Sequence, residues 1–133
     1  MDLRILEIAS NTENNKILEK HTHKSKNKNQ ICGDEMEISL LVKDDKVLDM
    51  GYQCKSCVYC QASVSLLSQN IKDKSLDEIK DLINACEKLF ETTKIILEKR
   101  WLIFKEIFNK KNISRKECLL LPMRTVIKAL KLQ

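Results

Sequence analysis

The sequence is poor in residues that interrupt regular structure, with two glycines, one proline and 5% aromatic residues among its 133 residues. This scarcity excludes collagen-like chains and disordered chains rich in glycine and proline. The sequence also lacks the ~18 consecutive apolar residues of a membrane-spanning helix, and its first residues, MDLRILEIAS, contain no signal-peptide core. We therefore expect a single helix-rich domain over residues 1–133, located in the cytoplasm, with no membrane partner.

The chain has little excess charge of either sign, because 24 basic and 19 acidic residues give a net charge of +5. Its densest basic stretch, KHTHKSKNKN at residues 20–29, has no aromatic side chains between the lysines. Proteins that bind single-stranded nucleic acids combine a basic groove with aromatic side chains on which the bases stack. We expect a solvated loop or an edge strand at this stretch, and no nucleic-acid partner.

An early pair of strands is predicted by side chains that alternate between apolar and polar. Met36, Ile38 and Leu40 alternate with polar residues, which is typical of a half-buried strand. The polar turn KDDK separates this strand from a second one at residues 47–54. Because the connection is so short, we expect the two strands to pair as an antiparallel hairpin.

Helical patterns follow from Cys57 to the end of the chain. The sequences SLDE and SRKE, the second at residues 114–117, each match a capping box. Helical spacing resumes over residues 95–108, and Pro122 is expected to separate the second box from a last helix at 123–131. The predicted fold is α+β, with a small antiparallel sheet of about three strands and helices packed on one face of it.

Cysteine is unusually frequent, with six in the chain. In a reducing compartment these residues predict metal ligands or reactive thiols more readily than disulfides. Cys54, Cys57 and Cys60 form a C-x2-C-x2-C run, but the fourth cysteine and the proline of a ferredoxin run are absent. A zinc ribbon is also excluded, because it requires a second C-x2-C pair.

Cys57 has the clearest physical reason to be reactive. It follows the second predicted strand and starts a predicted helix, where backbone N–H groups and the helix dipole favour the thiolate form. Cys32 opens the turn CGD before the partner strand, so the hairpin can bring Cys32 and Asp34 beside Cys57. The carboxylate of Asp34 is then available as a ligand or a proton acceptor.

Two segments resemble a known family. NQICGDEMEISL is similar to the N-P-x-C-G-D segment of IscU/NifU/SufU-type iron–sulfur cluster assembly scaffolds, and YQCKSCVYCQASVSLL is similar to their F-x-G-x-G-C-x-x-x-x-A-S-x-S segment. RILEIASNTENNKIL resembles the family's first helix, and LLLPMRTVIKAL resembles its C-terminal segment. The resemblance thus spans nearly the whole chain and implies the α+β fold of the NifU N-terminal domain.

The resemblance also implies the site residues. Cys32 and Cys57 match two of the three cysteines that hold a nascent cluster or a zinc ion. Asp34 matches the aspartate that shares the site and tunes release of the cluster. The third cysteine is expected at position 127, where this chain has Ile127, so the chain resembles a variant branch that lacks this thiol.

Other thiols are candidates for the missing ligand. On a helix that starts near Ser56, Cys60 lies three residues from Cys57 on the same face, so both can reach one metal. Cys54, which replaces a family glycine, and Cys118, which lies among leucines, are the less favoured alternatives. If none of them completes the site, the chain has lost full scaffold ability.

The function implied by the resemblance is that of a carrier and not of an enzyme. A cysteine desulfurase would pass persulfide sulfur to Cys57 or Cys32, and a transient 2Fe–2S cluster would move on to an apo iron–sulfur protein, with a chaperone as a further partner. One alternative is a zinc-binding sulfur acceptor or activator of a cysteine desulfurase. Another is an interaction module without catalysis on a degraded scaffold fold.

Overall fold

The computed structural model describes residues 3–92 and 94–131. Longer irregular segments precede the first strand and follow the third α-helix. The regular elements, in chain order, are α1 (Leu3–Ala9), β1 (His23–Lys28), β2 (Glu35–Lys43), β3 (Lys46–Lys55), α2 (Val58–Asn70), α3 (Leu76–Leu89), the 3-10 helices η1 (Lys99–Glu106) and η2 (Lys110–Arg115), and α4 (Lys116–Leu130).

The three strands form one antiparallel sheet in the order β1–β2–β3. Ile38 and Leu40 of β2 pair with Tyr52 and Met50 of β3, and all four side chains are buried. Because alternate residues of a strand share a face, these side chains line the inner face of the sheet. The predicted antiparallel hairpin is therefore confirmed.

The basic stretch at residues 20–29 contains the edge strand β1, which is one of the two conformations that we predicted for it. The ammonium groups of Lys24 and Lys26 lie 3.0 and 3.9 Å from the carboxylate of Glu37 on β2. These lysines alternate along the strand, so they share the outer face of the sheet. Lysines on an edge strand also disfavour pairing with the strand of another chain.

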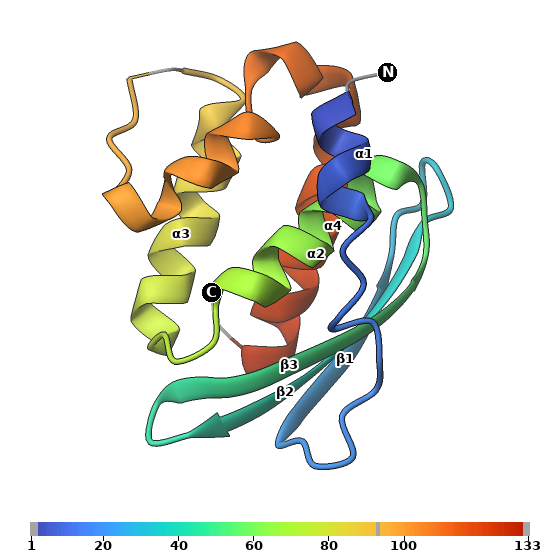
Figure 1. The fold of residues 1–133 in the computed structure, drawn as a ribbon, viewed down its shortest axis with the longest axis vertical. Coiled ribbons are helices and arrows are strands. Elements are labelled where there is room, and N and C mark those ends of the chain that lie inside the picture. The colour runs from blue at the N-terminus through green and yellow to red at the C-terminus, as the bar shows by residue number, and fades with distance from the viewer. Residues whose placement is uncertain (1–2, 93, 132–133) are drawn as a thin grey trace.

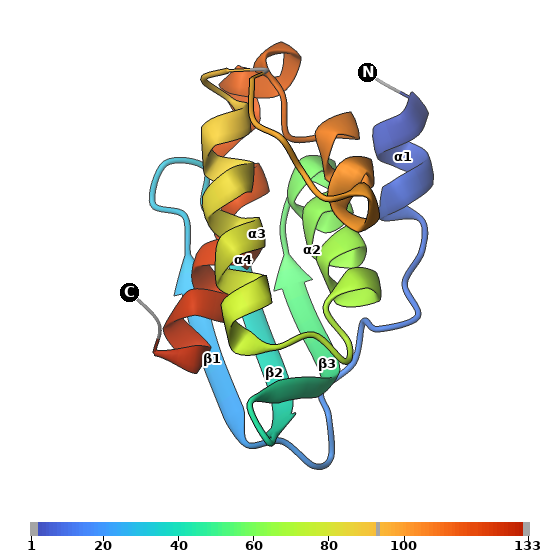
Figure 2. The ribbon, with the colours of Figure 1, turned by 90° about the vertical axis from the view of Figure 1, so that its left-hand side faces the viewer.

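The helices cover one face of the sheet (Figures 1 and 2). α2 packs against β3 and α4, and α4 also packs against β1 and β2. α1 packs on α2, while α3 packs on α4 and η1. The predicted α+β architecture is confirmed. Within the described part of the chain, no helix has both the length and the apolar character needed to cross a bilayer.

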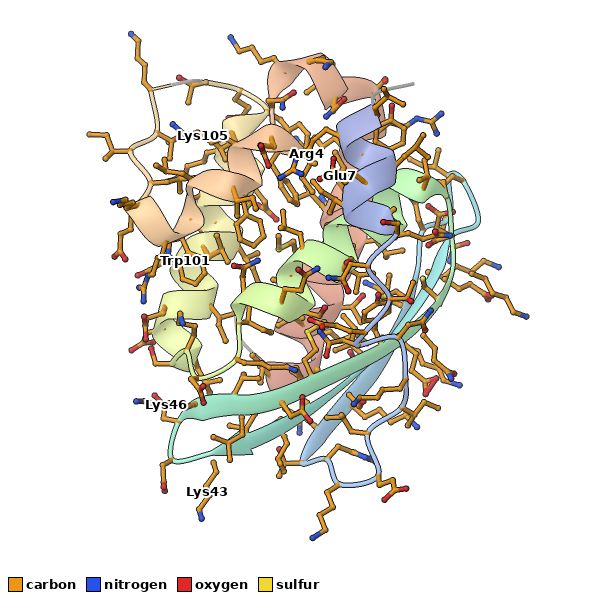
Figure 3. The ribbon with its side chains drawn as sticks, in the orientation of Figure 1. Arg4, Glu7, Lys43, Lys46, Trp101 and Lys105 are labelled. Carbon is orange, nitrogen blue, oxygen red and sulfur yellow. The ribbon has the colours of Figure 1, made fainter. Side chains whose placement is uncertain are left out.

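α3 and η1 show where local sequence signals succeed and where they fail. The capping box of α3 is present: the Glu78 N–H donates to Ser75 Oγ at 3.1 Å and the Ser75 N–H donates to Glu78 Oε1 at 3.0 Å. The helical spacing over residues 95–108 corresponds to a shorter 3-10 helix, η1, and not to an α-helix. A 3-10 helix has three residues per turn, so Trp101 and Phe104 lie on one side of η1, both buried, with ring centroids 6.1 Å apart. Figure 3 shows Trp101 directed from η1 toward α3.

α4 continues through Pro122, so the predicted break at this proline is wrong. The predicted capping box at residues 114–117 is wrong as well, because α4 has Arg115 as its N-cap and no side-chain capping bond. A proline inside a helix costs about 3 kcal/mol, but α4 is buried against α2 and two strands, and that packing outweighs the cost. Cys118 and the segment after Pro122 therefore belong to one helix.

Residues 14–18, which we call the outer segment, cross the face of the sheet opposite the helices (blue in Figure 1). The Tyr52 N–H donates to the carbonyl of Asn14 at 3.1 Å. Gly51 lies directly beneath the segment, because a Cβ at this position would lie 2.3 Å from the carbonyl oxygen of Lys16. The glycine is thus required by the close approach of two backbones.

The two ends of the sheet differ in character. At the β2–β3 hairpin, Lys43 and Lys46 extend into solvent (Figure 3). At the opposite end, the loop from β1 enters β2 and β3 leads into α2. This second end carries the cysteines that the sequence singles out.

Candidate metal centre

Three segments meet at the second end of the sheet: the loop before β2, the junction of β3 with α2, and the first turn of α4. Backbone hydrogen bonds of 2.8 Å close the loop, from Gly33 to Asn29 and from Asn29 to Asp34. Gly33 has a φ of +76°, a conformation that glycine adopts without steric cost. The loop leaves Cys32 exposed and buries Asp34.

Asp34 connects this loop to the start of α2. Its side chain belongs to a residue that is 6% exposed, and its Oδ1 accepts a hydrogen bond from the Cys57 N–H at 3.1 Å. Its Oδ2 is buried and has no hydrogen-bonding partner among the described residues. A buried carboxylate oxygen without a partner is unfavourable, and a bound cation would satisfy it.

Cys118, in the first turn of α4, brings a further thiol to this place. Its Sγ lies 3.6 Å from the Sγ of Cys32, and these two sulfur atoms and a carboxylate oxygen of Asp34 lie within 4.8 Å of one another. Burial raises the pKa of the Cys118 thiol well above its ordinary value, and the neighbouring Cys32, Cys57 and Asp34 raise it further. Four groups that can carry negative charge thus converge.

Of the thiols that the sequence offered as the third one, the structure brings Cys118, a less favoured alternative, beside Cys32 and Asp34. Position 127 lies about two and a half turns farther along α4 than Cys118, and the thiol that joins Cys32 and Asp34 is that of Cys118. The resemblance places the family's third cysteine after Pro122, whereas the thiol of Cys118 precedes the proline on the same helix. The available signal was a cysteine immediately before the family-like segment LLLPMR.

The structure does not bring the other two candidate thiols into this group. Cys60 faces the core from α2 and is 0% exposed, and Cys54 is partly buried on β3, opposite Met36. Burial is the main cause that raises the pKa of both thiols. Cys60 therefore lies outside the group of Cys32, Asp34 and Cys118, because its thiol faces the core.

The convergent donors suit thiophilic metals. Thiolates select zinc, copper(I) and iron–sulfur clusters, and a structural zinc ion takes four protein ligands in a tetrahedron. The carboxylate of Asp34 is a harder ligand than a thiolate, and it holds a soft metal less firmly. Three thiols and one carboxylate, one oxygen of which has no partner among the described residues, therefore fit a zinc ion or an iron–sulfur cluster.

Comparison with known proteins shows what the chain as a whole is similar to. The family of the NifU-like N terminal domain matches residues 2–95. The chain is 32% identical over 132 residues to a Thermotoga maritima protein named iron-sulfur cluster assembly scaffold protein IscU, covering 96% of this chain and 89% of that protein. Two crystal structures share the fold at 24% identity. One is a candidate iron-sulfur cluster assembly scaffold protein for the SUF system from Fervidobacterium islandicum (TM-score 0.89, covering 98% of this chain and 96% of that one). The other is the N-terminal part of a nitrogen-fixing NifU-like protein from Brucella abortus (TM-score 0.85, covering 98% and 91%).

Proposed function

This chain belongs to the family of NifU-like N-terminal domains, and we propose that it serves as a scaffold on which an iron–sulfur cluster is assembled and from which it is passed on. The observation that carries the proposal is the group of Cys32, Asp34 and Cys118, whose ligand atoms lie within 4.8 Å of one another. Cys57, whose thiol neighbours that of Cys118, supplies the third thiolate. The cluster, which we propose to be of the 2Fe–2S type, is cargo, so the chain acts as a carrier and not as an enzyme.

The partners that we propose follow from the chemistry of the site. Assembly needs sulfur in a transferable form, and a cysteine desulfurase would deliver it as a persulfide to a reachable thiol. Cys32 is exposed and Cys57 is partly exposed, so both can be reached from solvent. Release to an apo iron–sulfur protein would begin at Asp34, because its carboxylate is the ligand that a soft metal exchanges most easily. A chaperone that holds the C-terminal segment and a cytoplasmic location are further parts of this proposal.

A second candidate function is that of a zinc-binding sulfur acceptor, or an activator, that works with a cysteine desulfurase. The observation that favours it is the donor set itself, because three thiols and one carboxylate equal the four ligands of a tetrahedral zinc site. In that case the zinc ion would regulate access to the thiols, and no cluster would form.

Anaerobic reconstitution distinguishes the two candidates. If the scaffold proposal holds, protein incubated with ferrous iron and sulfide gains visible absorbance, binds both in a fixed ratio, and loses the colour when an apo-ferredoxin is added. Protein that stays colourless and binds one zinc ion instead supports the zinc-binding acceptor. Equal behaviour of the wild type, Cys32→Ala and Cys57→Ala in metal content and desulfurase stimulation would contradict both candidates.

Substitution of Asp34 by asparagine is expected to stabilise the metal-free protein while weakening the site. The side-chain carbonyl of asparagine can still accept the Cys57 N–H, and an uncharged amide replaces a buried carboxylate whose Oδ2 has no partner among the described residues. We expect the free energy of unfolding to rise by about 1 kcal/mol and the zinc affinity to fall at least about tenfold. Urea unfolding with a chelator present measures the first quantity, and competition with a chromophoric chelator measures the second.

Asp49→Asn is the matched control for this substitution. Asp49 is a partly exposed carboxylate on β3 that lies 3.4 Å from the ammonium group of Lys72. Exposed ion pairs contribute about 0–1 kcal/mol, so this variant should keep its zinc affinity and gain no stability. A less stable Asp34→Asn protein with unchanged zinc affinity would show that the carboxylate supports the fold and not the metal.

A further inference from the structure

Two cysteines lie one helical turn apart at the start of α2. Cys57 is the N-cap residue of this helix, and its carbonyl accepts the Gln61 N–H at 3.0 Å, so the first turn is regular. The side chain of Cys57 makes no capping hydrogen bond and is not held in that role, and the third residue of the helix is Cys60. In a helix of about 2.3 Å radius and 1.5 Å rise per residue, Cα atoms three residues apart lie about 5 Å from each other. A disulfide bridges Cα atoms roughly 4.4–6.8 Å apart. The backbone therefore permits a bond between these thiols.

The two thiols have opposite environments. Cys57 is partly exposed and lies beside Cys118 in the candidate metal centre. Cys60 is 0% exposed and belongs to the hydrophobic core. A C-x-x-C pair at a helix start, with one thiol open to a reaction partner and the other protected behind it, is the arrangement of redox-active dithiols. Cys60 is not one of the donors that we assign to the metal centre, so that site does not explain its position behind Cys57.

We propose that Cys60 is a resolving thiol that releases sulfide from a persulfide carried by Cys57. This inference rests on the proposed function, because it needs sulfur delivered to Cys57 as a persulfide. The sulfur atom of Cys60 attacks the Sγ of Cys57, and a Cys57–Cys60 disulfide forms. The bond between the Cys57 Sγ and the outer sulfur breaks, and its electron pair leaves with the outer sulfur. That sulfur also takes the proton of Cys60 and departs as hydrogen sulfide.

The proposed step supplies sulfide, which is the form of sulfur that an iron–sulfur cluster contains. The bridging sulfur of an iron–sulfur cluster is sulfide, whereas the outer sulfur of a persulfide is more oxidised and must gain electrons. Here the chain's own thiol supplies them, and no external oxidant or reductant enters the step. A dithiol reductant would then return the Cys57–Cys60 disulfide to two thiols before the next sulfur arrives.

The other thiols near Cys57 fit this task less well. Cys54 lies in β3, where the chain advances about 3.3 Å per residue, and Cys57 also has an extended backbone, with φ −69° and ψ 166°. The same spacing of three residues thus carries Cys54 away from Cys57, whereas the helical turn brings Cys60 back to it. The Sγ of Cys118 lies 3.6 Å from that of Cys32. A disulfide from Cys57 to Cys118 would remove two thiols from the metal centre at once, whereas a disulfide to Cys60 removes only Cys57, until it is reduced.

Peptide mapping tests the proposal directly on the wild-type protein. Cys57 and Cys60 share one tryptic peptide, residues 56–72, while every other cysteine lies in a different tryptic peptide. Metal-free protein is treated anaerobically with glutathione persulfide, quenched with iodoacetamide and digested with trypsin. We expect peptide 56–72 to be lighter by two hydrogen atoms and to carry no alkyl group, with an equal amount of sulfide released. Protein kept without the persulfide should carry alkyl groups on both thiols.

The variant Cys60→Ala should keep the persulfide on Cys57 and release sulfide at least about tenfold more slowly. Cys86→Ala is the matched control, because Cys86 is an equally buried thiol on α3, and it should behave as the wild type. The proposal is overturned if the disulfide joins Cys57 to another peptide, or if the wild type and Cys60→Ala hold the persulfide equally long. Absence of sulfur on Cys57 overturns it too. The scaffold function is judged separately, because iron and sulfide supplied directly should still build a cluster on Cys60→Ala.

Discussion

Replacement of Cys118 by serine is expected to lower the zinc affinity of the protein at least about 100-fold. Loss of a residue that merely supports a metal ligand costs 10–100-fold in affinity, and Cys118 offers a ligand atom itself, within 4.8 Å of those of Cys32 and Asp34. Serine has nearly the same size, but its hydroxyl stays protonated and is a poor ligand for a thiophilic metal. Competition with a chromophoric chelator measures the affinity, and visible absorbance after anaerobic reconstitution measures cluster binding.

Two control variants distinguish a role of Cys118 as a metal ligand from a role in packing the hydrophobic core. Cys86→Ser removes a core thiol from α3, and Ile127→Ala changes the position at which the family's third cysteine is expected. Both variants should bind zinc as the wild type does. An unchanged zinc affinity in Cys118→Ser would mean that the convergence of thiols at this end of the sheet is not a metal site.

The pH dependence of binding gives a second signature of Cys118. Burial raises the pKa of this thiol, so at neutral pH a metal must displace its proton. Binding should therefore strengthen as the pH rises, and protons should be released when the metal binds. In Cys118→Ser this displaced proton is lost, and the slope of affinity against pH should become shallower. The slope is measured by repeating the chelator competition at several pH values.

The part of the site that the sequence predicted depends on short-range structure. Cys32 and Asp34 stand just before β2, and Cys57 stands just after β3. Antiparallel pairing of two strands joined by a tight turn brings such flanking residues together whatever the rest of the fold does. The observed bond from the Cys57 N–H to Asp34 Oδ1, 3.1 Å long, is the direct result of that pairing.

Cys118 could not be placed in the same way. It meets Cys32 across 86 positions of sequence, and this contact exists only because α4 docks on α2 and on two strands. The propensity of Pro122 to end a helix pointed to a break between Cys118 and the last helix. Burial along both halves of α4 overrides that propensity, and a pattern of single residues does not report how two helices dock.

The position of the outer segment on the sheet was not predicted either. Its residues are mostly polar, and their hydrophobicity follows neither the two-residue period of a strand nor the 3.6-residue period of a helix. Its position is set by contacts with the sheet that a local pattern does not contain. The Leu18 N–H donates to Ser39 Oγ at 3.2 Å, and Asn14 Nδ2 donates to Ser68 Oγ of α2 at 3.1 Å. The outer segment thus makes hydrogen bonds both to the sheet, at Ser39, and to helix α2, at Ser68.

Substitution of Gly51 by alanine is expected to lower the free energy of unfolding by about 2–3 kcal/mol. The added Cβ would lie 2.3 Å from the carbonyl oxygen of Lys16, and the side chains of Leu18 and Ser39, both 3.2 Å away, leave it no free direction. The outer segment must move away from the sheet, which strains the bond from the Tyr52 N–H to the Asn14 carbonyl. Urea unfolding in the presence of a chelator measures the loss.

Gly33→Ala is the natural control, because the chain has only these two glycines and they are needed for different reasons. A Cβ at Gly33 meets no atom within 4 Å, but the φ of +76° is unfavourable for alanine and costs about 1–2 kcal/mol. Gly33 lies between Cys32 and Asp34, so this variant should bind zinc more weakly. Gly51→Ala, in contrast, should lose more stability and keep its zinc affinity.

If Gly51→Ala is as stable as the wild type, the outer segment does not rest on the sheet in solution. If it loses zinc affinity as well, the outer face and the metal centre are coupled through β3, which leads from Gly51 to Cys57.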